Sequence, residues 1–160
     1  MDRSIVAVSS RPSLAPLVAR WRVQAFFNHP GGYTVEEMTA LILAPPFGPK
    51  ETFVLFDSGQ PVGTAGVVRT DLETRLDLTP WLAGLFIEPA FRNRGHATAL
   101  IRQVEDFARS AGVPVLWLYT LKAENLYARL GWERESIEQE DGHDVVLMKR
   151  LLTKAHQAPR

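Results

Sequence analysis

The chain has 160 residues and no cysteine, and its 18 Lys and Arg residues balance its 18 Asp and Glu residues. The lack of cysteine excludes a thiolate nucleophile, a disulfide framework and cysteine-ligated zinc, and zero net charge without a basic run predicts no nucleic-acid and no membrane partner. The length fits one domain, expected over residues 1–150 with a C-terminal tail over 151–160, and no apolar window approaches the roughly 18 residues of a membrane span, so we expect a cytoplasmic protein.

The N-terminal third predicts one strand and two helices. Residues 5–8 form a short β-branched run that is typical of a strand. Apolar residues then recur at helical spacing over residues 14–26. A second helix is expected to begin at Thr34, because Thr34 and Glu37 have the spacing of a capping box.

The middle of the chain predicts three strands and a helix. The segments 52–56 and 61–69 flank residues 57–60, Asp-Ser-Gly-Gln, which have the composition of a hairpin turn. A third apolar run covers residues 81–87 and leads through a tight turn into an amphipathic helix over residues 97–111. The first two of these strands should therefore pair in an antiparallel manner.

The C-terminal part adds a strand, a short helix and a hairpin. Residues 115–119 are apolar on both faces, as expected of a central parallel strand reached by a helical crossover. A short helix runs through Tyr127, and a turn at residues 141–142 joins 132–134 to 144–148. Antiparallel hairpins on both sides of one βαβ unit predict an α/β domain with a mixed (α+β) sheet.

The turn before the long helix has the features of an anion site. It reads Phe-Arg-Asn-Arg-Gly-His-Ala over residues 91–97. Gly95 lets the backbone approach a ligand closely, and the helix directs its first unpaired N–H groups into the same space. Arg92 and Arg94 can add charge-assisted hydrogen bonds, each worth roughly 1–3 kcal/mol. The pattern therefore predicts a pyrophosphate cradle.

This turn also carries a family resemblance. Arg92-x-x-Gly95-x-Ala97 resembles the acetyl-CoA motif Gln/Arg-x-x-Gly-x-Gly/Ala of the GNAT N-acetyltransferase superfamily. Residues 125–133, Asn-Leu-Tyr-Ala-Arg-Leu-Gly-Trp-Glu, are similar to that family's Leu-Tyr-x-x-Leu-Gly-Phe/Trp stretch. The resemblance covers essentially the whole domain. It implies a GNAT-like fold with a mixed, mostly antiparallel sheet of about seven strands, about four flanking helices and a parallel pair of fourth and fifth strands.

The resemblance implies acetyl-CoA as co-substrate and no metal. Backbone N–H groups of the turn would hold the pyrophosphate, and the pantetheine arm would run like an extra strand between the fourth and fifth strands. The residues expected to bind the cofactor are Leu85, Phe86, Ile87, Arg92, Asn93, Arg94, Gly95, His96, Ala97, Thr98 and Thr120.

The expected reaction is direct attack of a primary amine on the thioester in a ternary complex. A backbone N–H of the fourth strand would stabilise the oxyanion. Tyr127 would be the general acid. A thiol has a pKa of about 8.5 and tyrosine one of about 10, so a hydrogen-bonded phenol can give its proton to the leaving thiolate at modest cost. The general base stays open between Glu88, Asp77 and Tyr119, directly or through water. The acceptor, a small-molecule or peptide amine, and a homodimer also stay open.

Two other interpretations fit the same residues. A non-catalytic acyl-CoA-binding module would keep the cradle without the chemistry, and an interaction protein would need no cofactor. The His96 side chain is expected to face solvent at the helix start, and Glu88 to be an exposed carboxylate at a strand end. Thr120 stands where ribosomal-protein acetyltransferases have an asparagine, so that substrate class is not favoured. Acidic residues that could attract a cationic acceptor are Glu36, Glu37, Asp71, Glu73 and Asp77.

Overall fold

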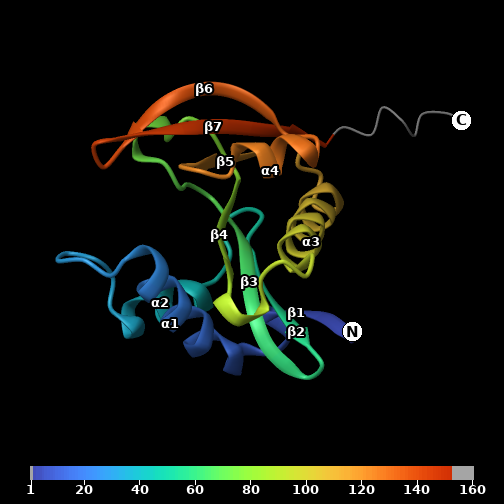
Figure 1. The fold of residues 1–160 in the computed structure, drawn as a ribbon. Coiled ribbons are helices and arrows are strands. Elements are labelled where there is room, and N and C mark those ends of the chain that lie inside the picture. Colours follow the sequence, from blue (N-terminus) through green and yellow to red (C-terminus); the bar gives the residue numbers. More distant parts are fainter. Residues whose placement is uncertain (1, 153–160) are drawn as a thin grey trace, which may run out of the picture.

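The computed structural model describes residues 2–152, which form a seven-stranded mixed sheet flanked by helices (Figure 1). The sheet order is β1-β2-β3-β4-β5-β7-β6. The strands are β1 (Arg3–Ala7), β2 (Glu51–Asp57), β3 (Gln60–Val68), β4 (Trp81–Ile87), β5 (Val115–Thr120), β6 (Glu133–Glu140) and β7 (His143–Leu151). The α-helices are α1 (Ala15–Phe26), α2 (Val35–Leu43), α3 (His96–Ser110) and α4 (Glu124–Arg129). The expected order of elements and the mixed α/β fold class are confirmed.

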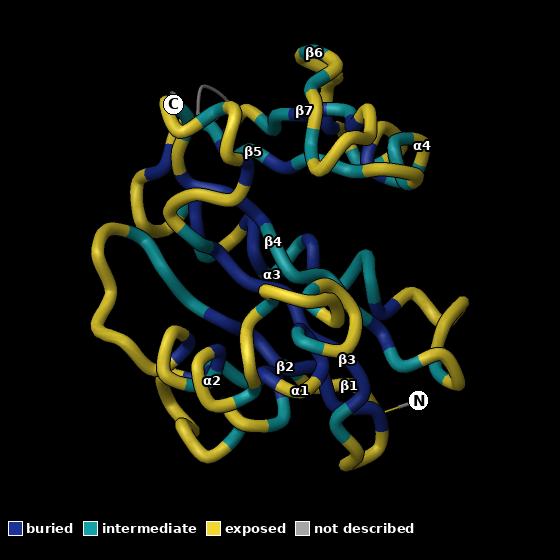
Figure 2. Tube along the Cα trace, turned by 90° about the vertical axis from the view of Figure 1, so that its left-hand side faces the viewer, coloured by how far each residue is buried: buried dark blue, intermediate teal, exposed yellow. Residues whose placement is uncertain are grey.

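β4 and β5 form the parallel pair that the resemblance implies, but they pair at a single register position, Trp81 with Trp117. Every other pair of neighbouring strands is antiparallel. Beyond Trp81 the two strands diverge, so the edge of β4 that faces β5 has no ladder partner. Figure 2 shows the result: β5, β6, β7 and α4 gather at one end of the molecule, and β1 to β3 with α1 and α2 at the other.

Successive side chains of β2 pack into two separate apolar clusters, one on each face of the sheet. Phe53 and Leu55 pack in one apolar cluster with α3, whereas Val54 and Phe56 pack in another with α1 and α2. This follows from the period of two in a strand, because successive side chains point to opposite faces. The helices thus cover both faces and hold β4 between them.

Local signals explain the turns and helix starts. Thr34 Oγ1 accepts a hydrogen bond from the Glu37 N–H at 3.1 Å, and the Thr34 N–H donates to Glu37 Oε1 at 2.9 Å, so the capping box is confirmed. The turn between β2 and β3 has Ser58 and Gly59 at φ values of 53° and 87°, as tight hairpins require.

Two details differ from the sequence prediction. In β5 only Leu116 and Leu118 are fully buried, because the strand borders the splay instead of lying between two complete ladders. Leu151 belongs to β7, and the N–H of the buried Leu152 donates to Pro114 O at 2.8 Å, so the body of the fold extends two residues into the predicted tail. The other tail residues lie outside the described part of the chain. Within residues 2–152 no helix is long and apolar enough to cross a membrane.

Candidate active site

A cavity of about 890 Å³ opens beside the C-terminal half of β4. It is walled by the end of α1, by β4, by the turn that precedes α3 and by the start of α4. The lining residues are Gln24, Ala25, Phe26, Leu85, Phe86, Ile87, Glu88, Pro89, Phe91, Arg92, Asn93, Gly95, His96, Ala97, Thr98 and Leu126. Nine of the eleven residues expected to bind the cofactor are in this set; Arg94 and Thr120 are not.

The turn before α3 is shaped by two left-handed residues. Asn93 has φ 64° and Gly95 has φ 82°, a region that glycine and asparagine adopt most readily. The first hydrogen bond of α3 runs from the Ala99 N–H to Gly95 O at 3.1 Å. The N–H groups of residues 96–98 therefore precede the helical ladder and are available to an anion at the cavity wall.

The imidazole of His96 is buried rather than solvent-facing, so that prediction is wrong. The residue is 1% exposed. Its Nδ1 accepts a hydrogen bond from Arg3 Nε at 3.1 Å, and its Nε2 lies 3.0 Å from Asp57 Oδ2. Because arginine only donates, Nδ1 carries the lone pair and Nε2 carries the proton that Asp57 accepts. His96 thus ties the start of α3 to the end of β2.

Arg94 turns away from the cavity and joins the same network. Its Nη1 donates to Asp57 Oδ2 at 3.1 Å, and its carbonyl accepts from Arg3 Nη2 at 2.8 Å. The hydrogen bond from His96, supported by those from Arg94 and Ser58, holds the pKa of Asp57 below its ordinary value. Sequence reasoning missed Asp57 and Arg3, because only the folded chain brings them to residue 96.

The cavity wall on β4 follows a bulge. The β3–β4 register shifts between Thr64 and Gly66, which face Phe86 and Ala83, so β4 carries one extra residue there. Gly84 has φ 69°, as a bulge of this kind favours. The residues that follow, 85–87, line the cavity while their β5-facing edge has no strand partner. Their peptide groups are thus free to hydrogen-bond an extended ligand.

Tyr127, the predicted general acid, is not among the residues that line the cavity, although its neighbour Leu126 is. The ring is 6% exposed and packs edge-on against Trp132, with 5.9 Å between ring centroids. Burial raises the pKa of Tyr127 to about 12. Its hydroxyl has no hydrogen-bond partner within residues 2–152, so the protonated phenol has a free donor. Thr120 acts locally instead, since its Oγ1 accepts from the Ala123 N–H before α4.

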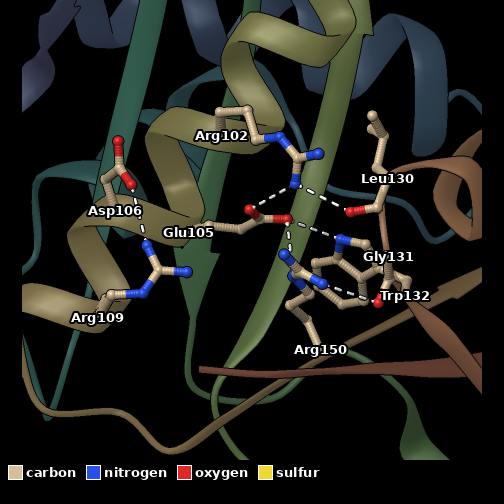
Figure 3. Close-up of polar contacts among 8 residues, drawn as sticks. All are labelled: Arg102, Glu105, Asp106, Arg109, Leu130, Gly131, Trp132 and Arg150. Atoms are coloured by element: carbon tan, nitrogen blue, oxygen red, sulfur yellow. Dashed lines mark hydrogen bonds and ion pairs between the residues drawn. The ribbon is translucent and has the colours of Figure 1, made fainter. Parts of the chain in front are cut away.

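A buried carboxylate fixes the turn after α4 that positions Tyr127 (Figure 3). Glu105 of α3 is 2% exposed and accepts hydrogen bonds from Trp132 Nε1 at 2.9 Å and Arg102 Nη1 at 2.8 Å. Arg102 also donates to Leu130 O at 3.0 Å, and Arg150 Nη1 donates to Gly131 O at 2.9 Å. α3 and α4 are therefore held together by charge-assisted hydrogen bonds.

The three candidate bases differ in their surroundings. Glu88 is half-buried, lines the cavity and accepts a hydrogen bond from Trp21 Nε1 at 2.8 Å, so the prediction of an exposed strand-end carboxylate is wrong. Asp77 forms an ion pair with Arg75 at 3.1 Å, and this hydrogen bonding lowers its pKa. Burial and nearby carboxylates raise the pKa of Tyr119, so its phenol is neutral at pH 7.

Asp71 is the one predicted acidic residue whose pKa rises. The residue reaches solvent, but the surrounding protein removes enough water from the carboxyl to raise its pKa to about 7. The positive charge of Arg22 opposes this shift, and the negative charge of Glu140 adds to it. Asp71 and Glu140 also raise the pKa of Tyr119, so the three groups interact electrostatically.

Sequence reasoning also missed part of the α1 wall. Gln24 and Ala25 line the cavity at the C-terminal end of α1, next to Phe26, which lines it too. Helical spacing gave no signal for a site, because Gln24 lies outside the apolar pattern and Ala25 belongs to it, which suggested only packing; both residues are exposed. Within residues 2–152 no group of three His, Asp or Glu side chains could hold a metal ion.

Comparisons with known proteins place the cavity in context. The model of the acetyltransferase (GNAT) family matches residues 17–132. A putative acetyltransferase, YncA, from Salmonella typhimurium with its cofactor acetyl-CoA superposes with a TM-score of 0.74 at 17% identity, over 99% of this chain and 98% of that one. An aminoglycoside 6'-N-acetyltransferase complexed with coenzyme A has a TM-score of 0.73 at 15% identity, over 100% and 99% of the two chains.

A third similar structure is a ribosomal-protein-S18-alanine N-acetyltransferase from Escherichia coli, with a TM-score of 0.68 and 18% identity over 99% of each chain. At these identities the structures share the fold alone. A search among curated proteins finds no sequence match.

Proposed function

This chain belongs to the acetyltransferase (GNAT) family, and on that premise we propose that it is an acetyl-CoA-dependent N-acetyltransferase that acts on a primary amine. The main support is that the turn before α3 and strand β4 border one cavity. Amides of residues 96–98 that precede the α3 ladder and an unpaired edge of β4 border the same cavity. One part suits a diphosphate, and the other suits an extended arm.

Different groups of residues bind different parts of the cofactor. N–H groups of the α3 start hold the pyrophosphate with the helix dipole behind them, and Asn93 and Gly95 shape the turn around it. Arg92 anchors this turn, since its Nε donates to Ile87 O at 2.9 Å. The peptide groups of residues 85–87 bond the pantetheine arm. Bound acetyl-CoA supplies the activated acyl group.

The reaction needs three contributions from the protein: stabilisation of the oxyanion, a hydrogen bond to the leaving thiolate, and a base. A backbone N–H of β4 stabilises the oxyanion that forms as the amine nitrogen attacks the acyl carbon. Tyr127 donates a hydrogen bond to the thiolate as the C–S bond breaks. Its pKa of about 12 lies well above the thiol value of about 8.5, so a hydrogen bond to the thiolate describes its role better than complete proton transfer.

Glu88 is the base that we favour, acting through water. It is the candidate carboxylate that lines the cavity, and its partner Trp21 is a neutral donor. Asp77 is already engaged with Arg75, and Tyr119 is a neutral phenol at pH 7. The proton that leaves the attacking amine passes to Glu88, and solvent returns one to the thiolate.

The acceptor is an amine of a small molecule or of a peptide. One similar structure is an aminoglycoside N-acetyltransferase and another is a ribosomal-protein N-acetyltransferase. The fold therefore serves both small-molecule and protein acceptors. The same proposal takes the chain as one catalytic domain; its cytoplasmic location and any homodimer stay predictions.

A thiol-release screen tests the proposed function. The chain is incubated with acetyl-CoA and a panel of polyamines, aminoglycosides, amino acids and short peptides, and free coenzyme A is measured with a thiol reagent. Release that depends on an amine supports the transferase. Calorimetric binding of acetyl-CoA without release by any amine would instead favour a non-catalytic acyl-CoA-binding module.

A further inference from the structure

A buried arginine lies beneath the β4 bulge. Arg22 projects from α1 and is 8% exposed. Its Nη1 lies 3.9 Å from Met38 Sδ, and its Nη2 donates to Thr52 Oγ1 at a long 3.4 Å. Its Nε is buried without any hydrogen-bond partner in the described chain. No carboxylate of residues 2–152 lies within ion-pair distance, so the guanidinium is a poorly compensated internal cation.

Two strand glycines make room for this cation. A Cβ at Gly84 of β4 would lie 3.1 Å from Arg22 Nε, and a Cβ at Gly66 of β3 would lie 3.0 Å from Nη2. Glycine inside a strand weakens it and often marks a place where another group approaches the backbone closely. Here the approaching group is the guanidinium, which rests against the two strands where their register shifts.

The placement is unfavourable for stability. Burial lowers the pKa of Arg22 to about 10, and the charge of Asp71 opposes that shift. The group is therefore still a cation at pH 7. A buried charge without a close partner destabilises a fold, and an apolar side chain of similar volume is often more stabilising. Since packing alone does not explain Arg22, a contribution to the adjoining site is the alternative.

We propose that Arg22 is a positioning residue for acyl transfer, whose positive charge acts through the β4 backbone on the acyl oxygen. This inference rests on the proposed function. Leu85 follows Gly84 directly and begins the β4 wall of the cavity. As the amine nitrogen bonds to the acyl carbon, the carbonyl electron pair moves onto oxygen, and it returns when the C–S bond breaks. A fixed cation beneath these peptide groups lowers the energy of that charge, and no proton passes to or from Arg22.

The kinetic test compares three variants. Arg22→Met keeps the length and removes the charge, Arg22→Lys keeps the charge, and Arg20→Met removes an exposed charge from the same helix. We expect Arg22→Met to lower kcat about tenfold, with an unchanged calorimetric Kd for acetyl-CoA and a melting temperature at or above that of the unaltered protein. Arg22→Lys should recover most of kcat, and Arg20→Met should change neither quantity.

A spectroscopic test does not depend on the acceptor. The infrared carbonyl stretch of acetyl-CoA labelled with ¹³C in the acetyl group reports the field at that bond. We expect the shift to lower frequency on binding to be smaller in Arg22→Met than in Arg22→Lys or the unaltered protein. Equal frequencies, an unchanged kcat, or failure of Arg22→Met to fold would each overturn the proposal, the last because the cation would then be needed for folding.

The two proposals fail in different ways. If acetyl-CoA binds but no amine releases thiol, the transferase activity is refuted and the carbonyl stretch still decides the role of Arg22. If the activity is present and the charge-free variant retains it, only the role of Arg22 is refuted.

Discussion

Replacing Glu105 by Gln should destabilise the fold strongly, although the side chain keeps its size. The carboxylate is 2% exposed and accepts hydrogen bonds from Trp132 and Arg102, while Arg150 Nε lies 3.7 Å away. A glutamine has one acceptor oxygen, so one of the two donors would face an NH₂ group. Arg150 would also lose its nearby negative charge.

The expected size follows from the burial of each partner. Breaking a buried ion pair costs about 3–5 kcal/mol when both groups are inside. The Arg102 and Arg150 side chains are 42% and 28% exposed. Although Arg150 Nε itself is buried, water reaches other parts of both side chains, so a loss of about 2–3 kcal/mol is more appropriate. For a chain of this length that corresponds to a melting temperature lower by roughly 5–10 °C.

Asp106→Asn is the matched control, because Asp106 is the next residue and also pairs with an arginine, Arg109, at 3.1 Å (Figure 3). That pair is largely exposed, so its loss should change stability by about 0.5 kcal/mol or less. Thermal melts followed by circular dichroism, with urea unfolding as a second measurement, give both values. If the two variants melt at the same temperature, the buried network contributes little and the reasoning is refuted.

Three further predictions concern the site. Tyr127→Phe should lower kcat and leave acetyl-CoA affinity nearly intact, as checked by thiol release and calorimetry; an unchanged rate with every good acceptor would remove the phenol from the mechanism. Gly95→Glu should abolish acetyl-CoA binding because it sets an anion against the diphosphate, whereas Gly112→Glu, with a similar φ of 80° and open space at the other end of α3, should bind normally; equal affinities in folded proteins would contradict the cradle. Asp71→Asn should raise the melting temperature more at pH 8 than at pH 4: the folded pKa of about 7 exceeds the unfolded value of about 3.9, so ionisation of Asp71 removes stability as pH rises between these values. A gain that does not vary with pH would show that Asp71 titrates normally.

Local signals predicted much of the fold. The capping box at Thr34, the turn at Ser58-Gly59 and the periodicity of α3 depend on neighbours within a few residues, and the structure confirms them. The pyrophosphate cradle could be predicted for the same reason, since Gly95 and the helix that follows are adjacent in the chain.

Contacts between distant segments could not be predicted. His96 is buried because the fold brings to it Asp57 and Arg3, which lie 39 and 93 residues earlier in the sequence. Glu88 is half-buried because Trp21 of α1 covers it. The guanidinium of Arg22 lies in a space that glycines on two strands leave open, and helical spacing says nothing of what faces a helix. In each case tertiary packing, not local propensity, decides the environment.

The unpaired edge of β4 has a consequence for the behaviour of the protein at high concentration. An open row of backbone donors and acceptors normally recruits strands from other molecules and starts aggregation. Here that row lies inside the fork between β4 and β5, with α1 and α3 on either side of it. Because this row lies within the sheet and not at its outer edges, β1 and β6, we expect it to be less open to strands of other molecules than those edges are.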